Sequence, residues 1–163
     1  MRSFTTRHTT RLFSLTILTL ALGLVQAQAK SDFSGTWKMN AAKSDFGQMP
    51  PPDTLTEKIT HQDPSLKVNV ASTGGMQGDM TYDISYTTDG KECVNHMGDN
   101  EFKSTLNWDG NDLVVDTKGS FSGNDFTSKG RWTLSADGKT LTITQHFSSA
   151  MGEMDMKEVF DKQ

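Results

Sequence analysis

The stretch DFSGTWKM, residues 32–39, decides the fold. Gly35 has no side chain, so a neighbouring segment can approach its backbone closely. Trp37 follows two residues later, and its indole is large enough to plug one end of a β-barrel. We expect the rest of the chain to supply short strands that close around Trp37.

Residues 1–29, which precede this stretch, have the parts of a secretory signal peptide. Three arginines give a positive start, and Leu12 to Val25 form an apolar run of about fourteen residues, too short to span a bilayer. Ala27-Gln28-Ala29 matches the small-residue pattern of a cleavage site. We expect cleavage after Ala29, a secreted or periplasmic location, and one domain over residues 30–163. The alternative is an uncleaved membrane anchor.

The charge and the cysteine content exclude several classes of function. Without the three leader arginines, 13 Lys and Arg face 20 Asp and Glu, a net charge of −7. This acidity argues against nucleic acid or an anionic membrane as a partner. Cys93 is the single cysteine, so no internal disulfide can form. His96 lies three residues further along the predicted strand, on its opposite face, so we interpret Cys93 as a half-buried structural thiol.

Alternation of apolar and polar residues predicts an all-β chain. Met80, Tyr82, Ile84 and Tyr86 share one face of the clearest segment, and no long segment has helical spacing. The predicted strands are 33–39, 54–62, 65–72, 79–88, 91–97, 101–108, 112–118, 125–135, 139–147 and 153–161. We therefore predict a single up-and-down antiparallel β-barrel of about 8–10 strands.

The connections predict one closed and one open end. Tight-turn signals occur at Asp63-Pro64, Asp89-Gly90, Asp109-Gly110-Asn111 and Ala136-Asp137-Gly138. The connections between them, at 40–53, 73–78, 98–100, 119–124 and 148–152, look longer and looser. Successive turns of a meander alternate between its two ends. The tight turns therefore gather at one end and the looser loops at the other, with 40–53 placed as a lid that could hold a turn of helix.

Residues 33–38 resemble the first-strand signature of the lipocalin and fatty-acid-binding-protein (calycin) superfamily, whose meander barrels hold small apolar ligands. The resemblance implies that Gly35 and Trp37 lie near the closed end and that a basic side chain from a late strand covers the indole. Arg131, the only arginine after the leader, is the best match, and Lys162 is the alternative. The chain is most similar to small lipocalin-like proteins of bacterial envelopes. It lacks the paired arginines and the tyrosine with which relatives hold a fatty-acid carboxylate.

Polar residues on the apolar faces predict a partly wet interior, because buried polar groups need partners. We name as candidate ligand-binding residues Glu57, Tyr82, Tyr86, Ser104, Trp108, Ser128, Gln145 and Glu158. His61 and Thr117 share these inner rows. With no inward cation beside Glu57 and Glu158, we expect a neutral or cationic amphiphile in place of an anion. A filled barrel, in which these groups bond one another, is the alternative.

Methionines gather near the expected open end, among them Met49, Met76, Met97 and Met151. They suit an adaptable apolar mouth, and thioethers also suit Cu(I). His146 could hold a haem, but nothing else in the sequence supports one, and we assign no metal site and no cofactor. No nucleophile elbow, paired catalytic carboxylates or phosphate loop is present, so we expect no enzyme. The predicted function is a secreted carrier or scavenger of a small apolar molecule. The alternative is an envelope barrel for metal handling or protein interaction with a filled interior.

Overall fold

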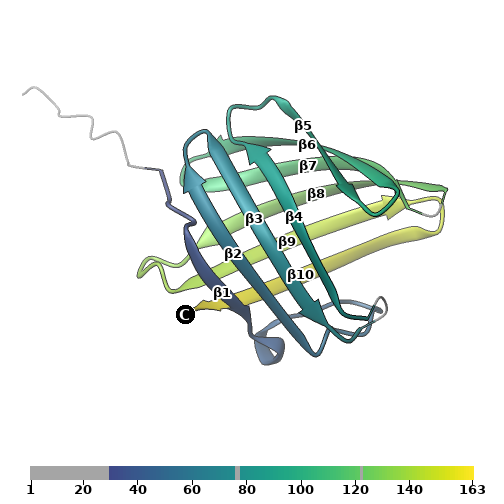
Figure 1. Cartoon of the computed structure of the whole chain (residues 1–163), viewed down its shortest axis with the longest axis horizontal. Coiled ribbons are helices and arrows are strands. Elements are labelled where there is room, and N and C mark those ends of the chain that lie inside the picture. Colours follow the sequence, from purple (N-terminus) through teal and green to yellow (C-terminus); the bar gives the residue numbers. More distant parts are fainter. Residues whose placement is uncertain (1–29, 76–77, 122) are drawn as a thin grey trace, which may run out of the picture.

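The computed structural model describes residues 30–75, 78–121 and 123–163, and the predicted signal peptide lies outside these residues. Ten antiparallel strands form one up-and-down sheet that curls into a nearly closed barrel (Figure 1), which confirms the predicted fold class. The strands are β1 (Gly35–Met39), β2 (Thr54–Gln62), β3 (Ser65–Thr73), β4 (Met80–Thr87), β5 (Glu92–Met97), β6 (Asn100–Asp109), β7 (Asp112–Phe121), β8 (Asn124–Leu134), β9 (Thr140–Ser149) and β10 (Gly152–Lys162). A 3-10 turn, η1 (Ala41–Lys43), follows β1.

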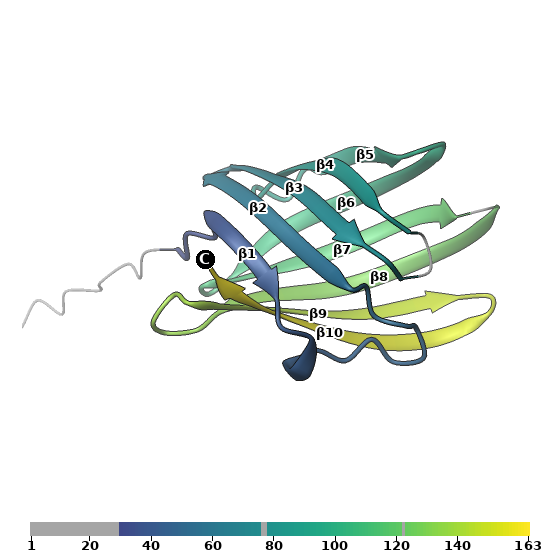
Figure 2. The ribbon, with the colours of Figure 1, turned by 60° about the horizontal axis from the view of Figure 1, so that its bottom comes forward.

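The sheet order is β4-β3-β2-β1-β10-β9-β8-β7-β6-β5, so β1 joins the first and last parts of the chain. β4 and β5 are the two edges, and in Figure 2 they lie side by side above the strands of the other wall. Side chains bridge this seam. The Asn95 amide donates to the Ser85 carbonyl at 3.0 Å and accepts from the Ser85 N–H at 2.8 Å. The Thr87 N–H donates to Cys93 Sγ at 3.1 Å, and Cys93 is half-buried.

Trp37 plugs the end of the barrel where the chain enters. Its side chain is fully buried, and its indole N–H donates to the Phe33 carbonyl at 2.9 Å. Phe33 itself is fully buried and contacts the rings of Trp108 and Trp132, at centroid distances of 6.1 and 6.0 Å. The aromatic cluster fills this end, and Trp37 is structural, as the stretch 32–39 predicts.

Arg131 was the wrong first choice of cation over this indole, and the alternative, Lys162, is confirmed. Lys162 lies there, with its ammonium 5.0 Å from the Trp37 ring centroid. Gly35 makes room for it, since a Cβ on Gly35 would lie 2.6 Å from Lys162 Cε. Arg131 instead points away from the core, because the neighbouring Trp132 points inward and side chains alternate along a strand. The Arg131 guanidinium pairs with Asp112 at 2.8 Å and with Asp109.

The prediction that tight turns gather at one end and longer, looser loops at the other was partly wrong. All four tight-turn signals do join strands at the plugged end. At the other end, however, β5–β6, β7–β8 and β9–β10 are separated by only two residues each. The strands continue further than the alternation predicts, to Phe121 and Ser149, because Gly and Ser at their ends still pair in register. The long connections at this end are 40–53 and the one between β3 and β4.

The first loop covers this open end, and it contains the predicted turn of helix, η1. The Asp45 backbone pairs with Lys157 of β10 through two hydrogen bonds of 2.7 Å. The Ser44 hydroxyl accepts the Val159 N–H at 2.9 Å. These bonds fix the loop against β10 and turn Phe46 inward, where it is 9% exposed.

Candidate ligand-binding cavity

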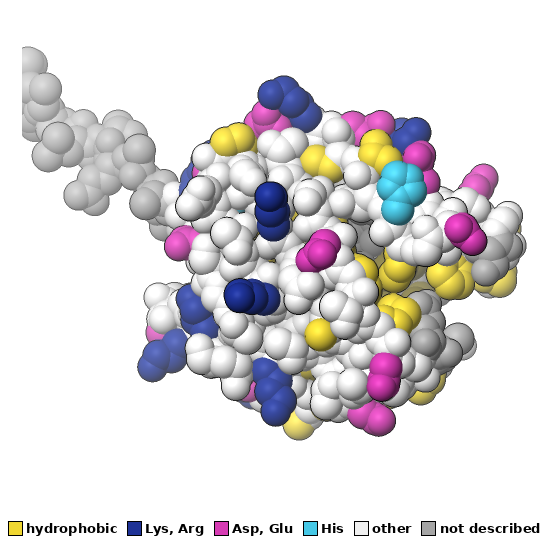
Figure 3. Space-filling model, viewed as in Figure 1, with side chains coloured by type: hydrophobic (Ala, Val, Ile, Leu, Met, Phe, Trp, Pro, Cys, Tyr) yellow, Lys and Arg dark blue, Asp and Glu magenta, His cyan; other side chains and the backbone are white. Residues whose placement is uncertain are grey.

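The interior is hollow above the aromatic plug, which excludes the filled barrel among our alternatives. The cavity measures about 790 Å³ and extends from Trp132 and Ile143 to the open end. Figure 3 shows a hollow edged by hydrophobic side chains at the right of the view. Two large apolar residues at this end are exposed, Phe121 by 41% and Met151 by 81%. Water and small molecules therefore have a path between the interior and the surface.

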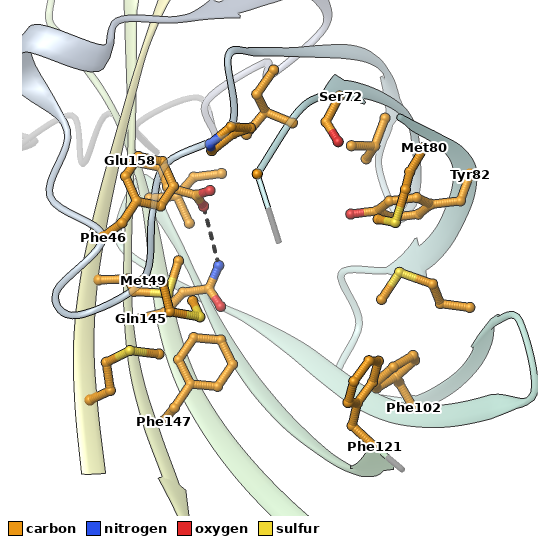
Figure 4. A pocket seen from close by; sticks show the side chains of 18 of the residues that line it. Phe46, Met49, Ser72, Met80, Tyr82, Phe102, Phe121, Gln145, Phe147 and Glu158 are labelled. Carbon is orange, nitrogen blue, oxygen red and sulfur yellow. Dashed lines mark hydrogen bonds between the residues drawn. The ribbon is translucent and has the colours of Figure 1, made fainter. Parts of the chain in front are cut away.

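One wall of the cavity is aromatic. Phe102, Phe126 and Phe147 line it on β6, β8 and β9, and neighbouring ring centroids lie 5.8 and 6.1 Å apart. Gly119 pairs with both Phe102 and Phe126, and a Cβ there would lie 2.8 Å from the Phe102 ring. The missing side chain thus lets the two rings approach across β7. Figure 4 shows the two ends of this wall, Phe102 and Phe147, facing the cavity from different sides, so the wall curves around the cavity.

Two acidic side chains enter the cavity from the strands on either side of β1. Glu57 of β2 pairs with Trp37, and Glu158 of β10 lies two residues before Phe160, the partner of Met39. Glu57 is 9% exposed, and its Oε2 has no hydrogen-bond partner among the described residues. The Gln145 amide donates to Glu158 Oε2 at 3.5 Å, a long bond (Figure 4). The acidic pair, as we name Glu57 and Glu158, is therefore poorly satisfied by the protein.

Burial controls the protonation of this pair. Loss of water around Glu57 raises the pKa of its carboxyl to about 8, and the charge of Glu158 adds to the effect. Burial also raises the pKa of Glu158 to about 7. The raised pKa of Tyr82, about 12, and the raised pKa of Tyr86 have the same main cause, so both phenols stay neutral. Near neutral pH the cavity can offer carboxyl protons as donors or carboxylates as acceptors.

The lining contains no positive side chain among the described residues. The polar groups that line it come from Glu57, Ser72, Tyr82, Tyr86, Asn124, Gln145, Ser149 and Glu158. A ligand carboxylate would meet no cation here and would face acidic groups. The arrangement therefore disfavours anions and suits a molecule with an apolar body and a neutral or positive polar group.

Five of the eight candidate residues line the cavity: Glu57, Tyr82, Tyr86, Gln145 and Glu158. The other three lie elsewhere. Ser104 is buried in the wall, where its hydroxyl and that of Thr117 lie 2.8 Å apart. Trp108 belongs to the plugged end and donates to Asp63 Oδ1 at 3.1 Å, and Ser128 is buried outside the lining. Each shares an inward face with the true lining residues but lies outside the cavity.

Sequence reasoning placed the first loop as a lid and Met49 at the mouth, but it missed Phe46, Pro50 and Pro52 as lining residues. Phe46, Met49, Pro50 and Pro52 all line the cavity, as does Leu55 just after the loop. The available signal was the presence of a large aromatic residue in an otherwise polar loop. Such a residue rarely stays in water without a reason. His61, by contrast, was expected in the interior and instead packs below it, where its Nδ1 accepts the Phe33 N–H at 3.4 Å.

Methionines line the cavity in number, as expected for its mouth: Met49, Met80, Met97, Met151, Met154 and Met156. Met76 lies outside the described residues. Within the described ranges, no three His, Cys, Asp or Glu side chains are placed to share a metal ion. The haem interpretation fails on geometry, since His146 is on the outer face, 46% exposed, with Nδ1 2.7 Å from Asp155. His96 also faces outward, beside Glu101, as the strand alternation predicts.

No helix within the described part of the chain is long and apolar enough to cross a bilayer. No protein-family model and no curated protein matches the sequence.

Several solved structures resemble the chain. Zebrafish ileal bile acid-binding protein with cholic acid matches at a TM-score of 0.57 and 17% identity, over 80% of this chain and 98% of that one. A point mutant of the fluorescent protein UnaG matches at 0.53 and 19%, over 80% and 95%. Schistosoma mansoni fatty acid binding protein with arachidonic acid matches at 0.52 and 12%, over 80% and 96%. The chain therefore has the barrel fold of the fatty-acid-binding and other calycin-type proteins.

Proposed function

We propose that the protein is an exported carrier or scavenger that encloses a small apolar molecule, neutral or cationic, in its barrel. The hollow interior carries this proposal, because a cavity of about 790 Å³ lined by aromatic and thioether groups is costly to leave filled with water. Structures of the same fold that are named for bile acids and fatty acids support a binding role. The lining differs from a site for anions, since the described lining residues include no Lys, Arg or His.

Export rests on the leader sequence alone. Its positive start, apolar run and Ala27-Gln28-Ala29 support secretion or delivery to a periplasm. Fractionation of cells that make the protein, followed by N-terminal sequencing, tests this part. A mature chain that starts at Lys30 outside the cytoplasm supports it, and an uncleaved cytoplasmic or membrane-bound chain contradicts it.

Native mass spectrometry on protein from its natural source tests the binding role. A small organic adduct that disappears on denaturation supports the proposal. Elemental analysis of the same sample tests the second candidate function, the handling of a soft metal ion. Six cavity methionines favour that candidate, because thioethers are good ligands for Cu(I). Stoichiometric copper without an organic adduct would favour metal handling over the carrier.

A defined probe molecule tests the binding role without protein from the natural source. Dodecanol has an apolar tail and one neutral polar group, so it should bind the mature protein with a measurable heat. Leu55→Asp and Phe147→Asp, which add a charge to the apolar lining, should abolish binding. Val94→Asp is the matched control, because Val94 is 48% exposed and lies outside the lining. Dodecanol binding that survives both Leu55→Asp and Phe147→Asp, or that never occurs in the wild type, contradicts an interior site.

A further inference from the structure

We infer that the acidic pair is an ammonium-binding site, and that a cationic amphiphile enters the cavity in exchange for protons, so that acidification releases it. The inference rests on the proposed function, since it requires that the interior holds ligands. It goes further by choosing the cationic class over the neutral one and by adding a pH-dependent release.

The position of the pair is the first support. β1 ends at Met39, and Glu57 and Glu158 lie on the strands that flank it, in the same cavity. Their carboxyl groups are offset along the barrel, since Glu57 pairs with Trp37 while Glu158 lies four residues before Lys162, the other partner of Trp37. Two carboxyl groups that face one cavity lined by no cation among the described residues cannot both ionise easily unless a positive charge joins them. An ammonium group supplies that charge.

Unsatisfied hydrogen-bonding capacity is the second support. Glu57 Oε2 has no partner within the described residues although Glu57 is only 9% exposed, and Glu158 receives one long bond from Gln145. A buried polar atom without a partner is costly. A primary ammonium has three charged donors, enough to satisfy the open Glu57 oxygen and further acceptors of the cavity. A neutral hydroxyl has one donor and leaves most of these acceptors without a partner.

The surroundings of the pair are the third support. Glu57 pairs with Val70 and Val70 pairs with Tyr82, so Glu57 and Tyr82 lie in one row across the sheet. Tyr86 and Trp132 also line the cavity. The faces of aromatic rings attract cations. A tail attached to the ammonium can extend along the wall formed by Phe102, Phe126 and Phe147 toward the open end.

No other titratable group among the described residues near the acidic pair takes over its charge or its titration. Tyr82 and Tyr86 on β4 stay neutral because burial raises the pKa of each phenol. Cys93 on β5 lies next to Tyr86, and Gln145 on β9 carries no charge. Asp45 and Asp53 of the first loop and the lysines of β1 and β2, Lys38 and Lys58, are exposed and lie outside the lining. Within the described residues, only Glu57 and Glu158 change charge in the cavity near neutral pH.

The direction of the pH effect follows. The free protein holds carboxyl protons below the raised pKa of each group, and these protons must leave before an ammonium can pair with both carboxylates. Affinity for a permanent cation therefore rises with pH, about tenfold per pH unit for each proton released. From pH 5.5 to pH 8.5 the dissociation constant of such a ligand should fall by about 100-fold or more. A neutral ligand with the same tail should show little change.

Isothermal titration calorimetry with three probes tests this: dodecylammonium, dodecanol and dodecanoate, on the mature protein at pH 5.5, 7 and 8.5. Dodecylammonium stays charged throughout, because alkylamines lose their proton near pH 10. At pH 8.5 we expect dodecylammonium to bind tightest and dodecanoate weakest. The same titrations in buffers of different ionisation enthalpy give the number of protons released on binding. This number should approach two at low pH.

Variants of the pair separate its role from that of the cavity. Glu57→Gln/Glu158→Gln should lose the preference for dodecylammonium over dodecanol and should lose the pH dependence of dodecylammonium binding. Either single change should leave one released proton, which keeps the test available if the double variant fails to fold. Glu153→Gln is the matched control, since it removes an exposed carboxyl from the same strand and should behave as the wild type.

The outcomes distinguish the two proposals. Dodecanol binding together with equal or tighter binding of dodecanoate overturns the ammonium site and leaves the carrier intact. A pH dependence that is flat, or that survives in the double variant, also overturns it. Failure of every probe to bind the folded wild type overturns the carrier itself.

Discussion

The two ends of this barrel differ in how far their buried polar groups are satisfied. At the plugged end, the Trp37 indole N–H bonds to the Phe33 carbonyl, and Asp63 accepts from the Thr88 hydroxyl and from Trp108, while His61 Nε2 has no partner among the described residues. In the cavity, Glu57 Oε2 has no partner among them either, and Glu158 receives a single long bond. A satisfied polar network rigidifies a fold, whereas unsatisfied groups weaken it until something binds them. We therefore interpret the plugged end as the part that serves folding and the cavity as the proposed binding site.

The titratable groups at the two ends also change the stability in opposite directions as the pH rises. His61, at the plugged end, has a lowered pKa because burial disfavours its cation. Its contribution to stability is therefore lost as the pH falls below about 6.5, the usual value for histidine. Burial raises the pKa of Glu57 to about 8 and of Glu158 to about 7. Their contribution is fully present below about pH 4.5 and is lost as the pH rises through these values.

The largest expected effect is that of Trp37→Ala, which breaks the plugged end. Removal of a fully buried indole should lower the free energy of unfolding by about 3–5 kcal/mol, measured by urea denaturation. Because Trp37 lies outside the cavity lining, the folded fraction should keep the same order of preference among the three probes. A stable variant with altered preference would mean that the two ends are assigned the wrong way round.

The acidic pair gives the next effect. The free energy of unfolding of the empty wild type should decrease by up to several kcal/mol between about pH 4.5 and pH 8, since folding there requires either proton uptake or buried charge. In Glu57→Gln/Glu158→Gln this decrease should be absent, and the loss between about pH 6.5 and pH 4.5 belongs to His61. Parallel profiles for the two proteins would contradict the raised pKa values.

Gly35→Ala should have a smaller effect, about 1–3 kcal/mol in the free energy of unfolding. The backbone φ of +148° at Gly35 is unfavourable for alanine, and the new Cβ would displace Lys162 from Trp37. Gly152→Ala is the control for the backbone alone, because Gly152 has φ +132° and no atom within 4 Å of a Cβ. An equal cost at both positions would show that the approach of Lys162 to Gly35 contributes nothing.

The smallest effect distinguishes the two candidate cations. A double-mutant cycle of Lys162→Met with Trp37→Phe should give a coupling energy of about 0.5–1 kcal/mol, typical of a cation–π contact near the surface. The same cycle with Arg131→Met should give none, since Arg131 pairs with Asp109 and Asp112 on the outside. Coupling to Arg131 without coupling to Lys162 would contradict the structure.

The sequence predicted the strands and the plug because both depend on local patterns. Alternation placed β2 at 54–62, which the structure confirms residue for residue. The same alternation argues against Arg131 as the cation over Trp37, because adjacent residues point to opposite faces and the neighbouring Trp132 is buried. That Arg131 is the only arginine after the leader says nothing about the face on which it lies.

The depth of a residue along the barrel was not predictable in this way. Ser104 and Trp108 share an inward face with cavity residues, yet they lie outside the cavity. Their depth depends on the tilt and stagger of the strands, which arise only when the sheet closes. The inward turn of Phe46 depends similarly on the pairing of Asp45 with Lys157, far along the chain.

A crystal structure of the mature protein with dodecylammonium at pH 8.5 tests most directly the claim that binding belongs to the acidic cavity. We expect the ammonium within hydrogen-bond distance of Glu57, on the side that faces Glu158, and the tail along Phe102, Phe126 and Phe147. An ammonium at the open end with its tail directed toward Trp132, or a ligand on the outer surface beside an empty cavity, would contradict the account.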